Sequence, residues 1–96
     1  MLDIEFTGRF RKDFKKAIKR GYDERALAKV VGLIQAGETR TLMDNYKDHP
    51  LTDSKLFKGC RECHIEPDWI LVYEIISERL VLRLLRTGTH SDIFKK

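Results

Sequence analysis

The strongest structural signal in this chain is a pair of apolar runs toward its C-terminal end. Residues 69–76 read WILVYEII and residues 79–87 read RLVLRLLRT, with only Ser77 and Glu78 between them. Short apolar runs rich in β-branched and aromatic residues predict strands. We therefore expect two successive strands here, the first of them central in a sheet, with Gly88 ending the second.

The residues before this pair predict another strand. In CRECHIE, residues 60–66, the side chains alternate between the two faces of a strand. Cys60, Glu62, His64 and Glu66 share one face, and Arg61, Cys63 and Ile65 share the other. Pro67 and Asp68 predict the turn into the next strand. The alternating residues 2–6, LDIEF, predict a short strand at the beginning of the chain.

Two helices are expected after this first strand. Apolar residues at helical spacing mark residues 8–20, with Thr7 as the N-cap and a glycine after the last turn. Residues 24–36 carry a second apolar stripe, with Asp23 as the N-cap and Gly37 at the end. The stripes are Phe10, Phe14, Ala17 and Ile18 in the first helix and Leu27, Val30, Val31 and Ile34 in the second. Together they predict an αα-hairpin.

Residues 38–59 show no clear periodicity, and Pro50 prevents a helix from continuing across them. We expect a long loop here, of a kind that is often functional. The expected order is β-α-α-β-β-β, an α+β fold in which a mainly antiparallel sheet packs against the N-terminal αα-hairpin. The chain has 96 residues, 42% of them hydrophobic, which predicts one domain over residues 1–96.

Nothing in the sequence predicts a membrane segment. The first residues, MLDIEFTGRF, lack a basic region followed by an apolar run, which argues against a signal peptide. No uncharged stretch approaches the roughly 20 residues that a membrane span requires. We therefore expect a cytoplasmic protein without a membrane partner.

The net charge of +4 is concentrated near the N-terminus. Residues 1–30 contain nine Lys or Arg residues and five acidic residues. Lys12, Lys16 and Lys19 lie away from the apolar stripe of the first helix. A basic face of this kind suits an anionic partner, nucleic acid first of all, and equally suits a solvated helix surface.

The motif formed by Cys60, Cys63 and His64 matches three kinds of site: a c-type haem attachment, half a zinc site and a redox dithiol. On a strand, two cysteines three positions apart point to opposite faces, whereas haem and zinc sites need sulfurs that converge. A thioredoxin-like dithiol lies at a helix N-terminus in a βαβ unit. We therefore expect no metal and no cofactor, and we expect Cys63 to be a small buried hydrophobic residue.

All three histidines, His49, His64 and His90, lie in loops or at strand ends. Together with Arg86 they suit the cleavage of RNA by its own 2′-hydroxyl. That reaction needs a base for the 2′-hydroxyl proton, a cation for the charge on the transition state, and an acid for the departing 5′-oxygen. Imidazole serves as base or acid near neutral pH, and the arginine fork fits phosphate oxygens. An exposed tryptophan or phenylalanine can stack on an unpaired base, and no metal is required.

Three stretches carry a family resemblance: YKDHPL at 46–51, HIEPDWILVYEI at 64–75 and LLRTGTHSDIF at 84–94. They resemble the signature of the YafQ branch of the RelE/ParE toxin superfamily, toxins of bacterial type II toxin–antitoxin pairs. The resemblance implies a RelE-like fold and a ribosome-dependent endoribonuclease that cuts mRNA in the ribosomal A site. It implies three partners: mRNA, the small ribosomal subunit with its rRNA, and a cognate antitoxin, a ribbon-helix-helix dimer.

The resemblance also implies roles for individual residues, although it leaves open which histidine is base and which is acid. The catalytic positions are His49, His64, Asp68, Arg86 and His90, with Arg86 stabilising phosphate. Trp69 and Phe94 match residues that support activity or position substrate, and the basic face with Lys12, Lys16 and Lys19 would contact rRNA or the antitoxin. The family often has aspartate where Glu62 stands, so the role of Glu62 stays open.

Simpler roles exist for four of these residues. His49 can cap the loop through Pro50, Asp68 can simply form a turn, Trp69 can be a core residue, and Arg86 can belong to an ion pair at a strand end. Two other functions are also compatible with parts of the sequence. One is a ParE-like toxin that inhibits DNA gyrase, a branch without the histidine set, and the other is a non-enzymatic basic binding module.

Overall fold

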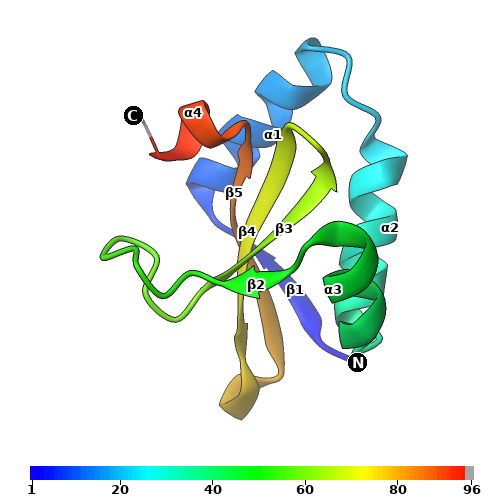
Figure 1. Cartoon of the computed structure of the whole chain (residues 1–96), viewed down its shortest axis with the longest axis vertical. Coiled ribbons are helices and arrows are strands. Elements are labelled where there is room, and N and C mark those ends of the chain that lie inside the picture. Colours follow the sequence, from blue (N-terminus) through cyan, green and yellow to red (C-terminus); the bar gives the residue numbers. More distant parts are fainter. Residues whose placement is uncertain (95–96) are drawn as a thin grey trace.

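The computed structural model describes residues 1–94, and its strands form a mixed sheet (Figure 1). The strands are β1 (Asp3–Phe6), β2 (His49–Pro50), β3 (Arg61–Glu66), β4 (Trp69–Ile76) and β5 (Val81–Gly88). Their order across the sheet is β1-β5-β4-β3-β2, with β1 parallel to β5 and the other neighbours antiparallel. The expected central strand, β4, lies in the middle, and the α+β fold with a mainly antiparallel sheet is confirmed.

The first two helices are α1 (Gly8–Lys19) and α2 (Glu24–Gln35), close to their predicted bounds. Both predicted N-caps are present. The Thr7 hydroxyl accepts a hydrogen bond from the Phe10 N–H at 3.0 Å, and the Asp23 carboxylate accepts one from the Arg25 N–H at 2.9 Å. Such caps satisfy N–H groups that the first helical turn leaves without partners.

The expectation of a loop over residues 38–59 is wrong in its first half. Residues Thr39–Tyr46 form α3, which lies beside α2 (Figure 1). Leu42 is buried and Tyr46, one turn later, packs on the same core. This apolar pair is too short a pattern to stand out in the sequence. Lys47, in the left-handed conformation at φ 53°, ends the helix and directs the chain into β2.

The sheet has an apolar cluster on each of its faces. The larger one packs the three helices against the sheet through residues such as Phe10, Leu27, Leu42, Leu71 and Leu82. The smaller one, on the other face, consists of Phe57, Cys60, Ile70, Val72 and Ile93. Cys63 belongs to the larger cluster and is fully buried, so the two cysteines lie on opposite faces as predicted.

The last element, α4 (His90–Phe94), begins two residues after β5 and folds back over the smaller cluster. A short 3-10 turn, Ser77–Arg79, connects β4 to β5. Within the part of the chain that the structure describes, no helix is long and apolar enough to cross a membrane.

Candidate active site

Three imidazoles surround one buried carboxylate at the β2 end of the sheet. His49 pairs with Glu62 across β2 and β3, and His64 follows Glu62 by two positions on the same face of β3. His90 enters from the start of α4. From the Glu62 carboxylate, the Nε2 atoms of the histidines lie at 3.9 Å (His49), 3.4 Å (His64) and 2.8 Å (His90). The structure thus brings together the three histidines that the sequence singled out.

Glu62, whose role the sequence left open, is the centre of this group. Its side chain is only 3% exposed. Within residues 1–94, its buried Oε1 accepts no hydrogen bond of good geometry, although His90 Nε2 is 2.8 Å away. A buried carboxylate oxygen without a hydrogen bond is unfavourable for stability, which points to a role of Glu62 in the site rather than in the core. The strand alternation, which placed Glu62 on the face of His64, was the signal that could have identified it.

Backbone and aromatic contacts orient the histidine rings. His49 Nδ1 lies 2.7 Å from the Lys47 carbonyl oxygen. Because a carbonyl only accepts, this contact places a proton on Nδ1, and in the neutral ring it leaves Nε2 as an acceptor. His64 Nδ1 lies 3.4 Å from the Pro67 carbonyl oxygen, across the turn that follows β3.

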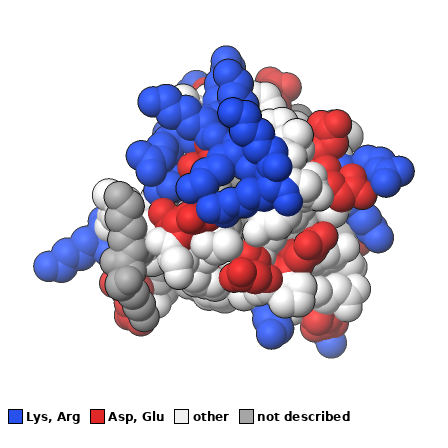
Figure 2. All heavy atoms as spheres, turned by 90° about the horizontal axis from the view of Figure 1, so that it is seen from above, with Lys and Arg blue, Asp and Glu red and all other residues white. Residues whose placement is uncertain are grey.

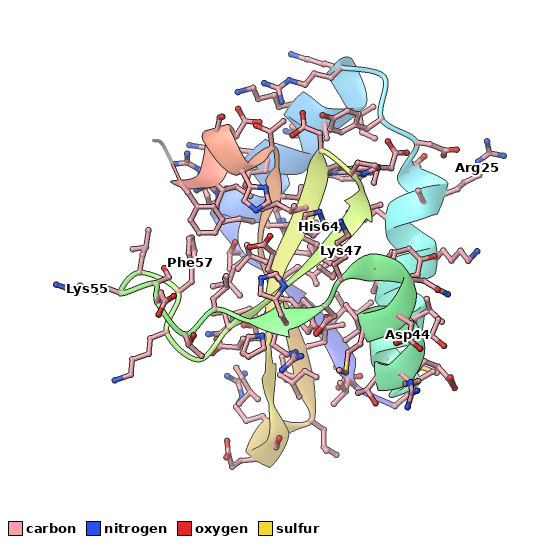
Figure 3. The ribbon with its side chains drawn as sticks, in the orientation of Figure 1. Arg25, Asp44, Lys47, Lys55, Phe57 and His64 are labelled. Atoms are coloured by element: carbon pink, nitrogen blue, oxygen red, sulfur yellow. The ribbon has the colours of Figure 1, made fainter. Side chains whose placement is uncertain are left out.

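The His90 ring is held between two other rings. Its centroid lies 5.4 Å from that of His64 and 5.7 Å from that of Phe94, on which it stacks. Phe94 in turn contacts Phe57 edge-on. Figure 3 shows His64 on β3, above β2 in this view. His49 and His90 are about half exposed, so a ligand reaches both rings from solvent.

A buried network on the opposite face of the sheet from Glu62 holds β2 in place. The Asp48 carboxylate accepts a hydrogen bond from Arg61 Nε at 2.6 Å and another from the Tyr73 hydroxyl. Burial, together with the hydrogen bond to Asp48, raises the pKa of the Tyr73 phenol far above its ordinary value, so the phenol remains a donor. Asp48 directly precedes His49, and the network therefore fixes the backbone that carries that imidazole. Sequence reasoning did not single out Asp48.

Trp69 does not face the site. It is 1% exposed, packs in the larger core cluster and contacts the Tyr22 ring at 4.7 Å between centroids. Its Nε1 donates to Thr87 Oγ1 at 2.8 Å, and that hydroxyl donates to the Ile70 carbonyl oxygen. The idea of an exposed tryptophan stacking on a base is wrong for this residue, because a ring of this size completes the core. Trp69 can support the site only indirectly, through β5.

Asp68 lies in the exposed turn between β3 and β4. Among the described residues, no hydrogen bond or ion pair connects its carboxylate to a histidine. The nearest link is through the chain, because the carbonyl oxygen of the preceding Pro67 contacts His64. The structure thus leaves Asp68 outside the group around Glu62.

Arg86 lies in a basic hollow next to the histidines rather than among them. Its Nε donates to Asp13 at 2.6 Å, so it has the ion-pair role that the sequence also allowed. The hollow is lined on the α1 side by Arg9, Lys12, Lys16 and Arg20. Ser91 borders both this hollow and the one that contains His49 and His90. Figure 2 shows the resulting patch of Lys and Arg side chains on the upper face of the molecule.

Two acidic side chains, Asp13 and Asp92, also line the basic hollow. Arg20 Nη1 lies 2.7 Å from the Asp92 carboxylate, and Lys16 Nζ lies 3.7 Å away. The hydrogen bond from Arg20, with further hydrogen bonds from Thr89, holds the pKa of Asp92 well below its usual range. Lys19, which the sequence grouped with Lys12 and Lys16, does not line this hollow.

Glu62, His64 and His90 also offer a donor set for a metal ion. One ligand atom from each lies within 4.8 Å of the others. Two imidazole nitrogens and a carboxylate oxygen are ligands of zinc and other first-row transition metals. The buried Glu62 Oε1, which lacks a hydrogen bond of good geometry, is a free ligand position of the right kind. Glu62, His64 and His90 therefore fit such an ion. The prediction of a metal-independent reaction concerns the proton transfers, not the ability of these residues to bind a metal.

The cysteines take no part in this site. Both are free thiols, and burial raises the pKa of Cys63 far above its ordinary value and that of Cys60 to a lesser degree. Because the two sulfurs lie on opposite faces of the sheet, the C-x-x-C-H motif is not a convergent ligand set.

N-terminal helices on a mainly antiparallel sheet, with a cluster of histidines beside a basic hollow, are the arrangement that the resemblance to the RelE/ParE toxin superfamily implied. A family model, bacterial toxin of type II toxin–antitoxin system, YafQ, matches residues 2–95. The chain belongs to this YafQ family. It is similar to the mRNA interferase toxin YafQ of Escherichia coli strain B / BL21-DE3, with 46% identity over 92 residues, 96% of this chain and 95% of that protein.

Solved structures agree with this assignment. The crystal structure of YafQ from E. coli BL21(DE3) has a TM-score of 0.82 at 44% identity, covering 98% of this chain and 99% of that one. YafQ in the E. coli DinJ–YafQ complex has a TM-score of 0.81 at 45% identity, with the same coverage. A metal-bound toxin from Helicobacter pylori has a TM-score of 0.86 at 44% identity, covering 98% of this chain and 100% of that one.

Proposed function

We propose that this chain is an mRNA interferase, an endoribonuclease that cuts mRNA in the ribosomal A site. The observation that carries the proposal is the convergence of His49, His64 and His90 on Glu62, beside a hollow lined with cationic side chains. The E. coli relatives at 46% and 45% identity are named mRNA interferase toxins, which supports the same activity here.

The proposed reaction is attack of a 2′-hydroxyl on the adjacent phosphate. One imidazole takes the 2′-hydroxyl proton and another returns a proton to the departing 5′-oxygen. His49 is suited to the first step, because the Lys47 carbonyl holds the proton on Nδ1 and leaves Nε2 free to accept. Arg86 provides cationic stabilisation of the phosphate. Phe94, stacked against His90, provides an apolar surface for a base.

The remaining assignments extend from the family. Asp68 is proposed as a contributor from the turn beside His64, and Trp69 as a support of the strand that precedes His90. Lys12, Lys16 and Lys19 are proposed to bind phosphates of rRNA or mRNA, an interaction that weakens with salt. The protein acts in the cytoplasm as one domain.

A cognate antitoxin is the second proposed partner. The E. coli relative forms a complex with DinJ, which supports direct neutralisation of the toxin by a bound protein. We propose that the antitoxin of this chain is likewise a ribbon-helix-helix dimer. A short neighbouring reading frame with that N-terminal pattern would be the simplest support for this partner.

The metal-ligand geometry adds one consequence to this mechanism. A relative from H. pylori has been seen with a bound metal. An ion held by Glu62, His64 and His90 would occupy imidazole nitrogens that the proposed reaction uses for proton transfer. A chelator that binds zinc but not magnesium should therefore leave cleavage on ribosomes intact, whereas added zinc should inhibit it. Cleavage that disappears with chelator and returns with metal would contradict the metal-independent mechanism.

The deciding experiment removes two imidazoles. The double variant His64→Ala/His90→Ala should abolish growth arrest on expression and abolish the cleavage products seen by primer extension on mRNA. Met43→Ala, an exposed side chain on α3, is the matched control and should stay toxic. Circular dichroism establishes that both variants fold. A folded double variant that still arrests growth and cleaves mRNA would overturn the proposal. DNA damage with intact mRNA would instead identify a gyrase-inhibiting toxin.

A further inference from the structure

The outer edge of β5 changes partner halfway along its length. Up to Leu84, this edge pairs with β1, where Phe6 is the last partner. Beyond Leu84, the side chains of Thr7 and Asp13 form hydrogen bonds with backbone groups of β5. Thr7 Oγ1 donates to the Leu85 carbonyl oxygen at 3.0 Å, and the Asp13 carboxylate accepts the Thr87 N–H at 3.1 Å. Where β1 ends, α1 therefore covers the edge of β5. Its side chains satisfy backbone groups that an exposed strand edge would leave without partners.

The same Asp13 carboxylate holds the guanidinium of Arg86. Oδ2 accepts from Nε at 2.6 Å and Oδ1 accepts from Nη2 at 3.3 Å, in a two-point pair that fixes the plane of the guanidinium. Both side chains are only 11% exposed. Arg9, on the outer side, adds a weaker contact at 3.7 Å. The Asp13 carboxylate thus accepts three hydrogen bonds from far along the chain, two from Arg86, 73 positions later, and one from the Thr87 N–H, 74 positions later.

This arrangement leaves part of Arg86 available. A guanidinium has five N–H donors, and Asp13 engages Nε–H and one N–H of Nη2. The three remaining donors belong to a side chain that lines the basic hollow with Lys12, Lys16 and Arg20. Among residues 1–94, no hydrogen bond engages these three donors, so the arginine, held on one side by Asp13, presents a rigid fork that suits the oxygens of a phosphodiester.

We propose that Asp13 is a positioning residue for Arg86: it fixes the guanidinium so that the free donors meet the phosphate in the transition state. This rests on the proposed nuclease function. Asp13 itself touches no substrate. Its effect should fall on the rate of cleavage rather than on ribosome binding, because misplacing a catalytic group by about 1 Å can reduce a rate about 100-fold.

The test measures kcat and KM for mRNA cleavage on programmed ribosomes. Asp13→Asn keeps the shape and one acceptor for the Thr87 N–H, and it should lower kcat about 10- to 100-fold with KM within about twofold. Glu5→Gln is the matched control, because Glu5 accepts from Nε of Arg83, an arginine on the same strand, at 2.7 Å. This variant should keep the wild-type kcat.

A double-mutant cycle distinguishes a positioning role of Asp13 from a purely structural role. Asp13→Asn should have no further effect on kcat when Arg86 is already alanine, whereas a merely structural role would add to the loss in that background. Arg86→Lys should lose as much kcat as Arg86→Ala, because an ammonium keeps the charge but cannot be held at two points. Additive losses, a wild-type kcat in Asp13→Asn, or a wild-type kcat in Arg86→Lys would each overturn the role of Asp13. Absence of cleavage by the wild-type protein would overturn the proposed function instead.

Discussion

The network around Asp48 allows a prediction of stability with a defined size. The perturbation is Asp48→Ala, which removes the acceptor of both the Tyr73 hydroxyl and Arg61 Nε. Tyr73 is 2% exposed, so its hydroxyl would remain buried without a partner. Losing a hydrogen bond to a charged group in such a place costs about 1.5–3 kcal/mol. Arg61 is 38% exposed and can turn to water, so its share is about 0.5–1 kcal/mol.

The two contributions predict a loss of about 2–4 kcal/mol in the free energy of unfolding. For a chain of this length, that loss corresponds to a decrease in Tm of about 10–25 °C. The assay is urea and thermal unfolding followed by circular dichroism. Asp44→Ala is the matched control, because Asp44, labelled on α3 in Figure 3, also accepts from an arginine Nε, that of Arg40, at 3.0 Å, but both partners are exposed. It should change stability by less than about 0.5 kcal/mol.

The same substitution in a second background, Tyr73→Phe, tests whether the Tyr73 hydroxyl causes the loss of stability. In Tyr73→Phe, no hydroxyl remains to be orphaned, so Asp48→Ala should then cost only about 1 kcal/mol, the Arg61 share. An equal loss of stability in both backgrounds, or a loss below about 1 kcal/mol in the wild type, would refute the argument that most of the loss comes from leaving the Tyr73 hydroxyl without an acceptor.

Three further outcomes follow from particular contacts. Trp69→Phe removes the hydrogen bond to Thr87 and leaves a cavity in the larger core cluster, so it should lower the free energy of unfolding by more than about 1 kcal/mol in urea titrations; an unchanged free energy of unfolding would contradict both contributions. Both cysteine thiols should react with a thiol reagent only after unfolding, because burial raises their pKa and excludes the reagent; rapid labelling of the native protein would contradict this. The Arg20 hydrogen bond lowers the pKa of Asp92, so the stabilisation by Asp92 is present at neutral pH and lost as the pH falls below about 4. Thermal unfolding should therefore give a higher Tm for the wild type than for Asp92→Asn at pH 6, and this difference in Tm should be smaller at pH 2. A difference in Tm that is the same at both pH values would exclude the ion pair as its source.

The sequence by itself determined most of the local structure. Period-two and period-3.6 patterns depend only on which side chains face the core, and they predicted β3, β4, β5, α1 and α2 with their caps. The same patterns placed Cys60 and Cys63 on opposite faces, which argued against sulfur chemistry. The histidines were identified as candidates by residue type, because few side chains transfer protons near neutral pH.

Only the tertiary structure decided which of these residues meet. The pairing of β2 with β3 and the return of α4 placed Glu62 between the histidines, and neither contact has a local signature. Trp69 became a core residue because packing, not residue type, decides whether an aromatic ring is exposed. Arg86 joined Asp13, from the opposite end of the chain, because the edge of β5 needed a partner where β1 ends. Such contacts depend on the closure of long loops around a shared core, and a periodic pattern in the sequence carries no information about them.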